Sequence, residues 1–147
     1  MPEVPSTRRF LRILLIVLAV FLGLSAIPGG ISLLVGFNAP PLEQLEGSVF
    51  PDFVVPGLAL LGVVGGSATL AAVLLLRKNR FAIPAAIASG LVVMTFEFVE
   101  VLAIGSPPGP ARVMQVLYFA IGAALAGISL GNLIIDARSA QPPPTHL

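Results

Sequence analysis

The chain alternates four long apolar stretches with short polar connections. The apolar stretches cover residues 10–36, 53–76, 81–104 and 112–135. Each is long enough to cross a bilayer as a helix, which takes about 20 residues. Glycine and proline recur within them, as is typical of membrane helices. The pattern predicts an all-α, membrane-embedded four-helix bundle that forms a single transmembrane domain over residues 1–138.

Composition supports the same environment. Of the 147 residues, 56% are hydrophobic and only 10% are charged, and the formal net charge is +1. Soluble domains carry about 25% charged residues, so this chain lacks the polar surface that water requires and we expect the lipid bilayer to surround it. The low charge, without a basic stripe, also argues against a nucleic-acid partner.

Basic residues are distributed unequally between the two sides of the membrane. With four crossings, only Arg112 of the eight Lys and Arg residues falls on one side. The other seven share the opposite side: Arg8, Arg9, Arg12, Arg77, Lys78, Arg80 and Arg138. By the positive-inside rule, both termini of this multi-pass cell-membrane protein are predicted to be cytoplasmic. Alternatively, the first stretch is a cleaved signal peptide, with small residues at Ser25 and Ala26; cleavage would leave three spans and an unbalanced 77–80 loop.

The first span is interrupted by Pro28-Gly29-Gly30. Proline removes a backbone donor and the glycines loosen the turn, so we expect the first helix to be kinked or broken near residues 28–30. This interruption is either a bend that fits the helix to its neighbours or a hinge or cavity wall. At the other end of the chain, residues 139–147 contain three consecutive prolines and are predicted to be a disordered, proline-rich tail.

The connection over residues 37–52 is the longest polar stretch. Apolar residues are interleaved with its acids, so it is either a solvated loop or an amphipathic turn with Leu42, Leu45 and Val49 directed inward. In the second case it would cap the bundle like a lid.

Small residues recur at four-residue spacing in three of the spans. This spacing allows helix backbones to approach closely. We expect these faces to pack inside the bundle, and homodimerisation through them is the alternative. The residues are Gly62 and Gly66; Ala82, Ala86 and Gly90; and Ala123, Gly127 and Gly131.

Two glutamates, Glu97 and Glu100, lie in the outer half of the third span. Residues three apart share a helix face, and a carboxylate in a membrane helix is costly. The fourth span begins with Arg112, followed at three-residue steps by Gln115 and Tyr118. A short loop makes these two helices antiparallel neighbours, so Arg112 is the predicted partner of Glu100 and of Glu97 as an alternative.

These five residues form the candidate ligand or ion site. One interpretation is structural: an acid pairs with Arg112, the other bonds Gln115 or Tyr118, and the network sets the helix register. The other is functional, because two carboxylates facing one guanidinium suit proton relay or cation binding. No catalytic, cofactor or metal-binding residue is predicted. The chain has no cysteine, and its only histidine, His146, lies in the tail.

The layout resembles that of small, mostly uncharacterised bacterial four-helix integral membrane proteins of the inner membrane. The resemblance rests on the Pro28-Gly29-Gly30 interruption, the loop segment Asn38-Ala39-Pro40-Pro41-Leu42 and the second-span entry Pro51-Asp52-Phe53-Val54-Val55-Pro56-Gly57. It is also loosely similar to DoxX-like membrane proteins, which share four spans and a glycine-rich second span. Some DoxX-like proteins are tied to redox functions.

Three functional hypotheses follow. The first is a non-enzymatic accessory or interaction subunit that associates with a larger membrane protein or with further copies of itself. The second is a binder or transporter of a proton, small cation or lipid-like molecule, acting through an outer-half polar cavity around Glu97, Glu100 and Arg112. The third is an enzyme that uses Glu97 and Tyr118 in acid–base chemistry, although the chain lacks a cofactor motif.

Overall fold

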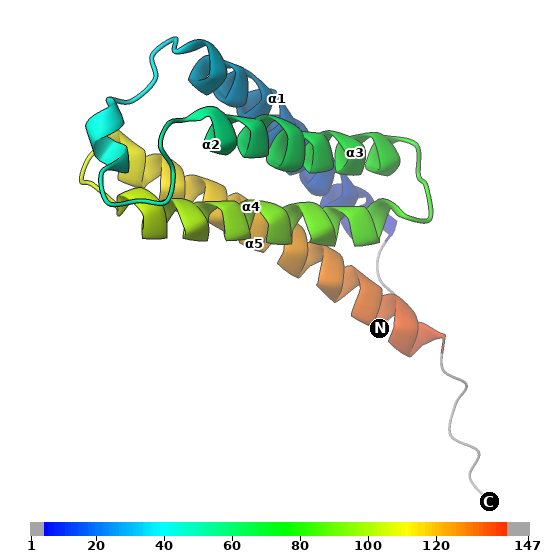
Figure 1. The fold of residues 1–147 in the computed structure, drawn as a ribbon. Coiled ribbons are helices and arrows are strands. Elements are labelled where there is room, and N and C mark those ends of the chain that lie inside the picture. The colour runs from blue at the N-terminus through cyan, green and yellow to red at the C-terminus, as the bar shows by residue number, and fades with distance from the viewer. Residues whose placement is uncertain (1–4, 141–147) are drawn as a thin grey trace, which may run out of the picture.

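The computed structural model describes residues 5–140, and within this range it contains only helices and connecting turns. Four long helical segments run antiparallel to their sequence neighbours, and the polar loop after the first crosses one end of the bundle (Figure 1). The elements are α1 (Pro5–Val35), η1 (Leu42–Leu45), α2 (Val54–Leu58), η2 (Ala59–Val64), α3 (Gly65–Leu76), α4 (Ala82–Ile104) and α5 (Pro110–Ser139).

The predicted all-α fold with four membrane-length helices is confirmed. Each of the segments Ser6–Val35, Val54–Leu76, Ala82–Ile104 and Pro110–Ser139 is long and apolar enough to cross a membrane. The second comprises α2, a π-helical turn at η2 and α3 in continuous succession. Most of the predicted tail, residues 141–147, lies outside the described residues, and Ser139 is the last helical residue of α5.

Helix α1 continues through Pro28 to Val35, so of the two predicted alternatives a break near residues 28–30 is excluded, and a kink there stays a prediction. A membrane helix tolerates proline when its neighbours accommodate the change. Gly30 instead has a packing role, since a Cβ atom there would lie 2.6 Å from the Leu61 backbone nitrogen and 2.7 Å from the Gly57 carbonyl oxygen. The Pro28-Gly29-Gly30 segment therefore allows α1 to contact the backbone of α2 and η2.

Helices α4 and α5 meet through a second glycine contact. A Cβ atom on Gly90 would lie 2.5 Å from the Gly122 carbonyl oxygen, and one on Gly122 would lie 2.7 Å from the Gly90 carbonyl oxygen. Ala82 and Ala86 are also buried, which confirms that the predicted small-residue face of the third span packs internally.

The other two small-residue faces point away from the bundle, so their predicted internal packing is wrong. Cβ atoms on four glycines of these faces would meet nothing within 4 Å: Gly62, Gly66, Gly127 and Gly131. The close contacts use Gly65 on α3 and Gly122 on α5 instead. Spacing alone identified surfaces that permit close approach, but not the side of the helix that faces its neighbour.

Large apolar side chains cover the outside of the bundle, whereas many core residues are small. Leu24, Phe98 and Leu102 are 70%, 61% and 71% exposed. Alanines at positions 19, 68, 71 and 86 are fully buried. In water, such a surface would greatly exceed the apolar patches that monomeric proteins usually expose. This distribution fits a protein whose outer surface contacts lipid.

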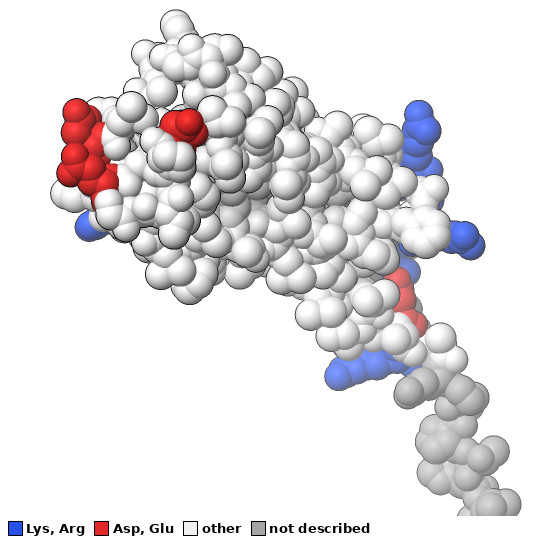
Figure 2. Space-filling model, in the orientation of Figure 1, with Lys and Arg blue, Asp and Glu red and all other residues white. Residues whose placement is uncertain are grey.

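Charged residues gather at opposite ends of the bundle (Figure 2). We call the end that carries the 36–53 and 105–109 loops the acidic end, because the exposed acids Glu43, Glu46 and Asp52 lie there. We call the end formed by the start of α1, the 77–81 loop and the end of α5 the basic end.

At the basic end, α3 terminates in a Schellman motif. The amide of Asn79 donates to the Leu74 carbonyl, and the amide of Lys78 donates to the Leu75 carbonyl. This pair of bonds satisfies carbonyl groups that have no partner within the helix. Arg12 of α1 completes the end, because its Nε and Nη2 atoms donate to the Leu75 carbonyl oxygen at 3.1 and 2.9 Å.

Candidate functional site

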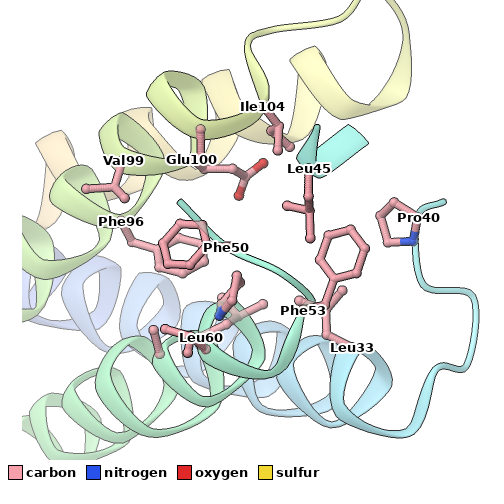
Figure 3. Close-up of a pocket in the computed structure, with 14 residues that line it drawn as sticks. Leu33, Pro40, Leu45, Phe50, Phe53, Leu60, Phe96, Val99, Glu100 and Ile104 are labelled. Carbon is pink, nitrogen blue, oxygen red and sulfur yellow. The ribbon is translucent and has the colours of Figure 1, made fainter. Parts of the chain in front are cut away.

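Two adjoining cavities lie at the acidic end, between the first two spans and the last two. We call the first the apolar cavity, which has a volume of about 220 Å³. Every side chain lining it is apolar except that of Glu100, whose carboxylate points toward the cavity centre (Figure 3). Its lining residues are Leu33, Pro40, Leu45, Phe50, Phe53, Val55, Pro56, Ala59, Leu60, Phe96, Val99, Glu100, Ala103 and Ile104.

The loop between α1 and α2 closes one side of the apolar cavity. Leu45, in η1, is only 6% exposed, and Phe53 is 8% exposed. Leu42 and Val49 are 60% and 89% exposed, so the prediction that they turn inward with Leu45 is wrong. The loop thus covers the cavity through Leu45 and the phenylalanines of its second half.

The second, which we call the polar cavity, has a volume of about 290 Å³. It shares Leu33, Leu60, Phe96 and Glu100 with the apolar cavity. Its remaining lining residues are Ser25, Ala26, Gly29, Ser32, Asn38, Glu97, Met114, Gln115 and Tyr118. Four of the five predicted site residues, Glu97, Glu100, Gln115 and Tyr118, therefore line one cavity.

Glu97 is the most unusual of these residues. Its side chain is only 5% exposed, and among residues 5–140 no hydrogen bond or ion pair to its carboxyl group is found. Helix α4 places it one turn before Glu100, on the face directed toward α1 and α5. A buried carboxyl group without a partner is costly in a protein interior. A bound molecule that donated hydrogen bonds to Glu97 would reduce that cost.

Glu100 and Gln115 form the polar connection between α4 and α5. The Gln115 Nε2 atom donates to Glu100 Oε1 at 3.1 Å and to the Gly105 carbonyl oxygen at 3.2 Å. Because both acceptors are oxygen atoms, the NH2 group of the Gln115 amide must face them. The flipped orientation would place Gln115 Oε1 against these two oxygens. The Gln115 Oε1 atom is buried and has no partner in the described part of the chain. It is thus a second unsatisfied acceptor.

Arg112 does not pair with either glutamate, so the predicted ion pair is wrong. Its guanidinium group is exposed and donates through Nε and Nη2 to the Ser106 carbonyl oxygen, at 3.1 Å from Nε. The loop between α4 and α5 contains Gly105 and Gly109 at positive φ, which lets the chain turn and present that carbonyl. Arg112 lines neither cavity. The two acids therefore face a neutral amide instead of a cation.

Tyr118 lies at the side of the polar cavity, where its ring stacks on Phe21 of α1 with ring centroids 6.5 Å apart. This contact links α5 to α1 across the cavity wall. Two further acids at the acidic end, Glu46 and Asp52, are exposed and line neither cavity. Asp52 instead accepts a hydrogen bond from the Val54 amide at 2.9 Å, at the start of α2.

Sequence reasoning missed the contribution of α1 to this site. Ser25 and Ser32, seven residues apart, share one face and line the polar cavity. Both are partly satisfied locally, since Ser25 donates to the Phe21 carbonyl at 2.8 Å and Ser32 donates to the Phe37 carbonyl. The signal that could have found them is a pair of polar residues at a two-turn spacing within an otherwise apolar span.

The fold and the lipid-facing surface fit the class of multi-pass integral membrane proteins with four spans. The chain matches no family model, no curated protein and no solved structure in the comparisons made with each. The two cavities are therefore the features of this protein that bear on its function.

Proposed function

We propose that the protein binds a small lipid-like molecule at the acidic end, with its head group in the polar cavity and its hydrocarbon chain in the apolar cavity. The observation that carries this proposal is the buried, unpartnered Glu97 of the polar cavity, which adjoins a second cavity lined by apolar side chains and Glu100. Ligand sites in proteins are commonly mostly apolar clefts with a few convergent polar groups.

The head group of the proposed ligand must donate hydrogen bonds. Gln115 Oε1 is a buried acceptor without a partner among the described residues, and Glu100 already accepts a hydrogen bond from Gln115. Glu97 adds a carboxyl group that makes no hydrogen bond among the described residues. Among the described residues lining this cavity, no lysine or arginine is present. An ammonium group on the ligand would supply both the missing donors and the missing positive charge.

The chain of the proposed ligand is accommodated by aromatic and aliphatic side chains. Phe50 and Phe53 come from the covering loop and Phe96 from α4, and all three line the apolar cavity (Figure 3). Burial of hydrocarbon there stabilises the complex by about 25 cal/mol per Å² of apolar surface removed from water. A molecule with a polar head and a short hydrocarbon chain thus matches both cavities at once.

Binding of decylamine tests this function. Decylamine should raise the thermal unfolding midpoint of the purified chain in a neutral detergent more than decanol or decanoic acid does. Glu97→Gln and Glu100→Gln should each weaken decylamine binding by about tenfold or more, because each removes a charge-assisted hydrogen bond worth about 1.5–3 kcal/mol.

The matched control is Glu43→Gln, which makes the same substitution at an exposed position in η1. It should leave decylamine binding unchanged. Equal responses to decylamine and decanoic acid, or equal losses in the control and the two cavity variants, would show that the amine binds the micelle and not this site.

A second candidate function is that of an accessory subunit, and the outward glycine faces favour it. Gly62 and Gly66 on one helix and Gly127 and Gly131 on another leave backbone open to a neighbouring helix. Such faces promote helix association in lipid. The partner would be a larger membrane protein or a second copy of the chain.

Native mass spectrometry after mild extraction tests this association. Gly66→Leu and Gly127→Leu should abolish the complex. A parent chain that is found monomeric and without any partner would exclude this function.

We also propose that the protein lies in the cell membrane of a bacterium, with the basic end and both termini in the cytoplasm. The distribution of seven basic residues at that end and one at the other supports this orientation. Because the chain contains no cysteine, a single cysteine can be introduced at Ser48 for labelling. A membrane-impermeant maleimide should label it in intact cells, and labelling only after lysis would reverse the orientation.

A further inference from the structure

We propose that the basic end holds a binding site for the phosphate head group of an anionic phospholipid. A groove with a volume of about 650 Å³ lies there against the side of α1. Four of its six lining residues are basic. We call it the basic groove, and its lining residues are Arg8, Arg9, Arg12, Ile13, Ile16 and Lys78.

The groove combines charge with apolar surface in the order that a phospholipid requires. Arg9 and Ile13, and likewise Arg12 and Ile16, lie four residues apart, so the four side chains share one side of α1. The arginines lie nearer the helix start, and the isoleucines lie deeper in the span. Ile13 is 50% exposed, so it can contact an acyl chain while the basic groups contact the head group.

Two of the four basic side chains are already positioned by contacts within the protein. Arg12 donates to the Leu75 carbonyl oxygen at 3.1 and 2.9 Å, which holds its guanidinium at the junction of α1 and α3. Arg8 forms an ion pair with Asp136 of α5 at 3.1 Å. No acidic side chain among the described residues lines the groove, so the positive charge of Arg9 and Lys78 is available to a phosphate.

Lys78 occupies a backbone position that favours glycine. Its φ is +53°, at the left-handed position that ends the Schellman motif of α3. Glycine adopts this conformation without the steric cost that a side chain brings. The lysine side chain is exposed and extends over the groove from the loop opposite α1. A binding role for its ammonium group accounts for a lysine at this position.

The geometry favours a membrane lipid over a soluble phosphate. Phosphate oxygens accept charge-assisted hydrogen bonds from guanidinium and ammonium groups, and basic clusters at membrane helix ends recognise anionic head groups. A soluble phosphate would use only the four basic residues. A phospholipid would also cover Ile13 and Ile16, which lie on the membrane side of the groove.

Lipid retention on the purified full-length chain tests this site. Measured by native mass spectrometry in a neutral detergent, phosphatidylglycerol should bind about tenfold or more tightly than phosphatidylcholine with the same acyl chains. Arg9→Gln and Lys78→Gly should each reduce phosphatidylglycerol affinity about fivefold, the loss expected for one basic residue near a lipid head group. Inorganic phosphate at millimolar concentration should not displace the lipid.

Lys78→Gly also controls for folding, since glycine suits the left-handed backbone and should leave the unfolding midpoint without lipid unchanged or raised. Arg80→Gln provides the charge control. Arg80 lies in the same loop and stacks on Phe81, 4.6 Å from the ring centroid, but does not line the groove. Its substitution should change affinity less than twofold.

Three results would overturn the proposal. An Arg80→Gln loss equal to that of Lys78→Gly would assign the effect to general surface charge. Unchanged phosphatidylglycerol binding in Arg9→Gln and Lys78→Gly would place the lipid elsewhere. Displacement by inorganic phosphate would identify a soluble anion as the ligand.

Discussion

Replacing Gly90 with alanine is expected to lower the free energy of unfolding by about 3 kcal/mol, the upper range for overpacking a tight contact. The added Cβ atom would lie 2.5 Å from the Gly122 carbonyl oxygen and 2.7 Å from the Ala126 amide nitrogen. Both of these are backbone atoms, which cannot move aside as the end of a flexible side chain can. Helices α4 and α5 would have to separate along their contact. Reversible unfolding by SDS in mixed micelles would measure the change.

Gly127→Ala is the control for this prediction, because a Cβ atom there would meet nothing within 4 Å. The same substitution at this position should be neutral or stabilising by up to about 1 kcal/mol, since alanine favours the helix more than glycine does. Similar changes in free energy for Gly90→Ala and Gly127→Ala would show that the two helices are not in backbone contact at Gly90.

Replacing Arg12 with methionine is expected to lower the free energy of unfolding by about 2 kcal/mol. Methionine retains much of the apolar length of the side chain but removes the donors to the Leu75 carbonyl oxygen. Hydrogen bonds that involve a charged group contribute about 1.5–3 kcal/mol. The loss would also detach the start of α1 from the end of α3. The measurement is SDS unfolding in micelles without added phospholipid, so that lipid binding does not contribute.

Arg9→Met is the matched control, since it removes the same charge one turn earlier on α1. Arg9 makes no hydrogen bond or ion pair within the described residues. Its substitution should change the free energy of unfolding by less than about 0.5 kcal/mol, as is usual at exposed sites. If both variants were equally destabilised, the cause would be the loss of charge at the helix start, and the carbonyl contact would have no separate effect.

The four spans could be predicted because a bilayer imposes a minimum length of apolar helix, and that length is directly visible in a sequence. The side of each helix that faces its neighbours could not be predicted in this way. In the second span, the segment Ala59–Val64 is π-helical and has more residues per turn than an α-helix. It therefore changes the spacing of residues that face the same side, and Gly57 and Gly65 both contact α1. A four-residue pattern selected Gly62 and Gly66 instead, because it assumes a regular α-helix.

The candidate site was predictable to the extent that it depends on position within a helix. The spacing of Glu97 and Glu100, and their placement opposite Gln115, follow from helix geometry and a short connecting loop. The partner of Arg112 depends on the path of that loop, which turns the Ser106 carbonyl toward the guanidinium. The amino-acid sequence does not show where the carbonyl group of a loop residue will point. The predicted ion pair between Arg112 and Glu100 was therefore wrong.

The two glycine contacts have a consequence for how the protein is assembled. The Gly30 contact joins the first two spans, and the Gly90 contact joins the last two, so each joins helices that are consecutive in the chain. Each pair is thus a helical hairpin that requires closure of a single loop, over residues 36–53 in the first and 105–109 in the second, and the entropic cost of closure grows only slowly with loop length. The first hairpin can dock as soon as the ribosome has delivered its second span, before α4 and α5 exist. The ligand cavities lie where the two hairpins meet, so they are completed only at the last step of synthesis.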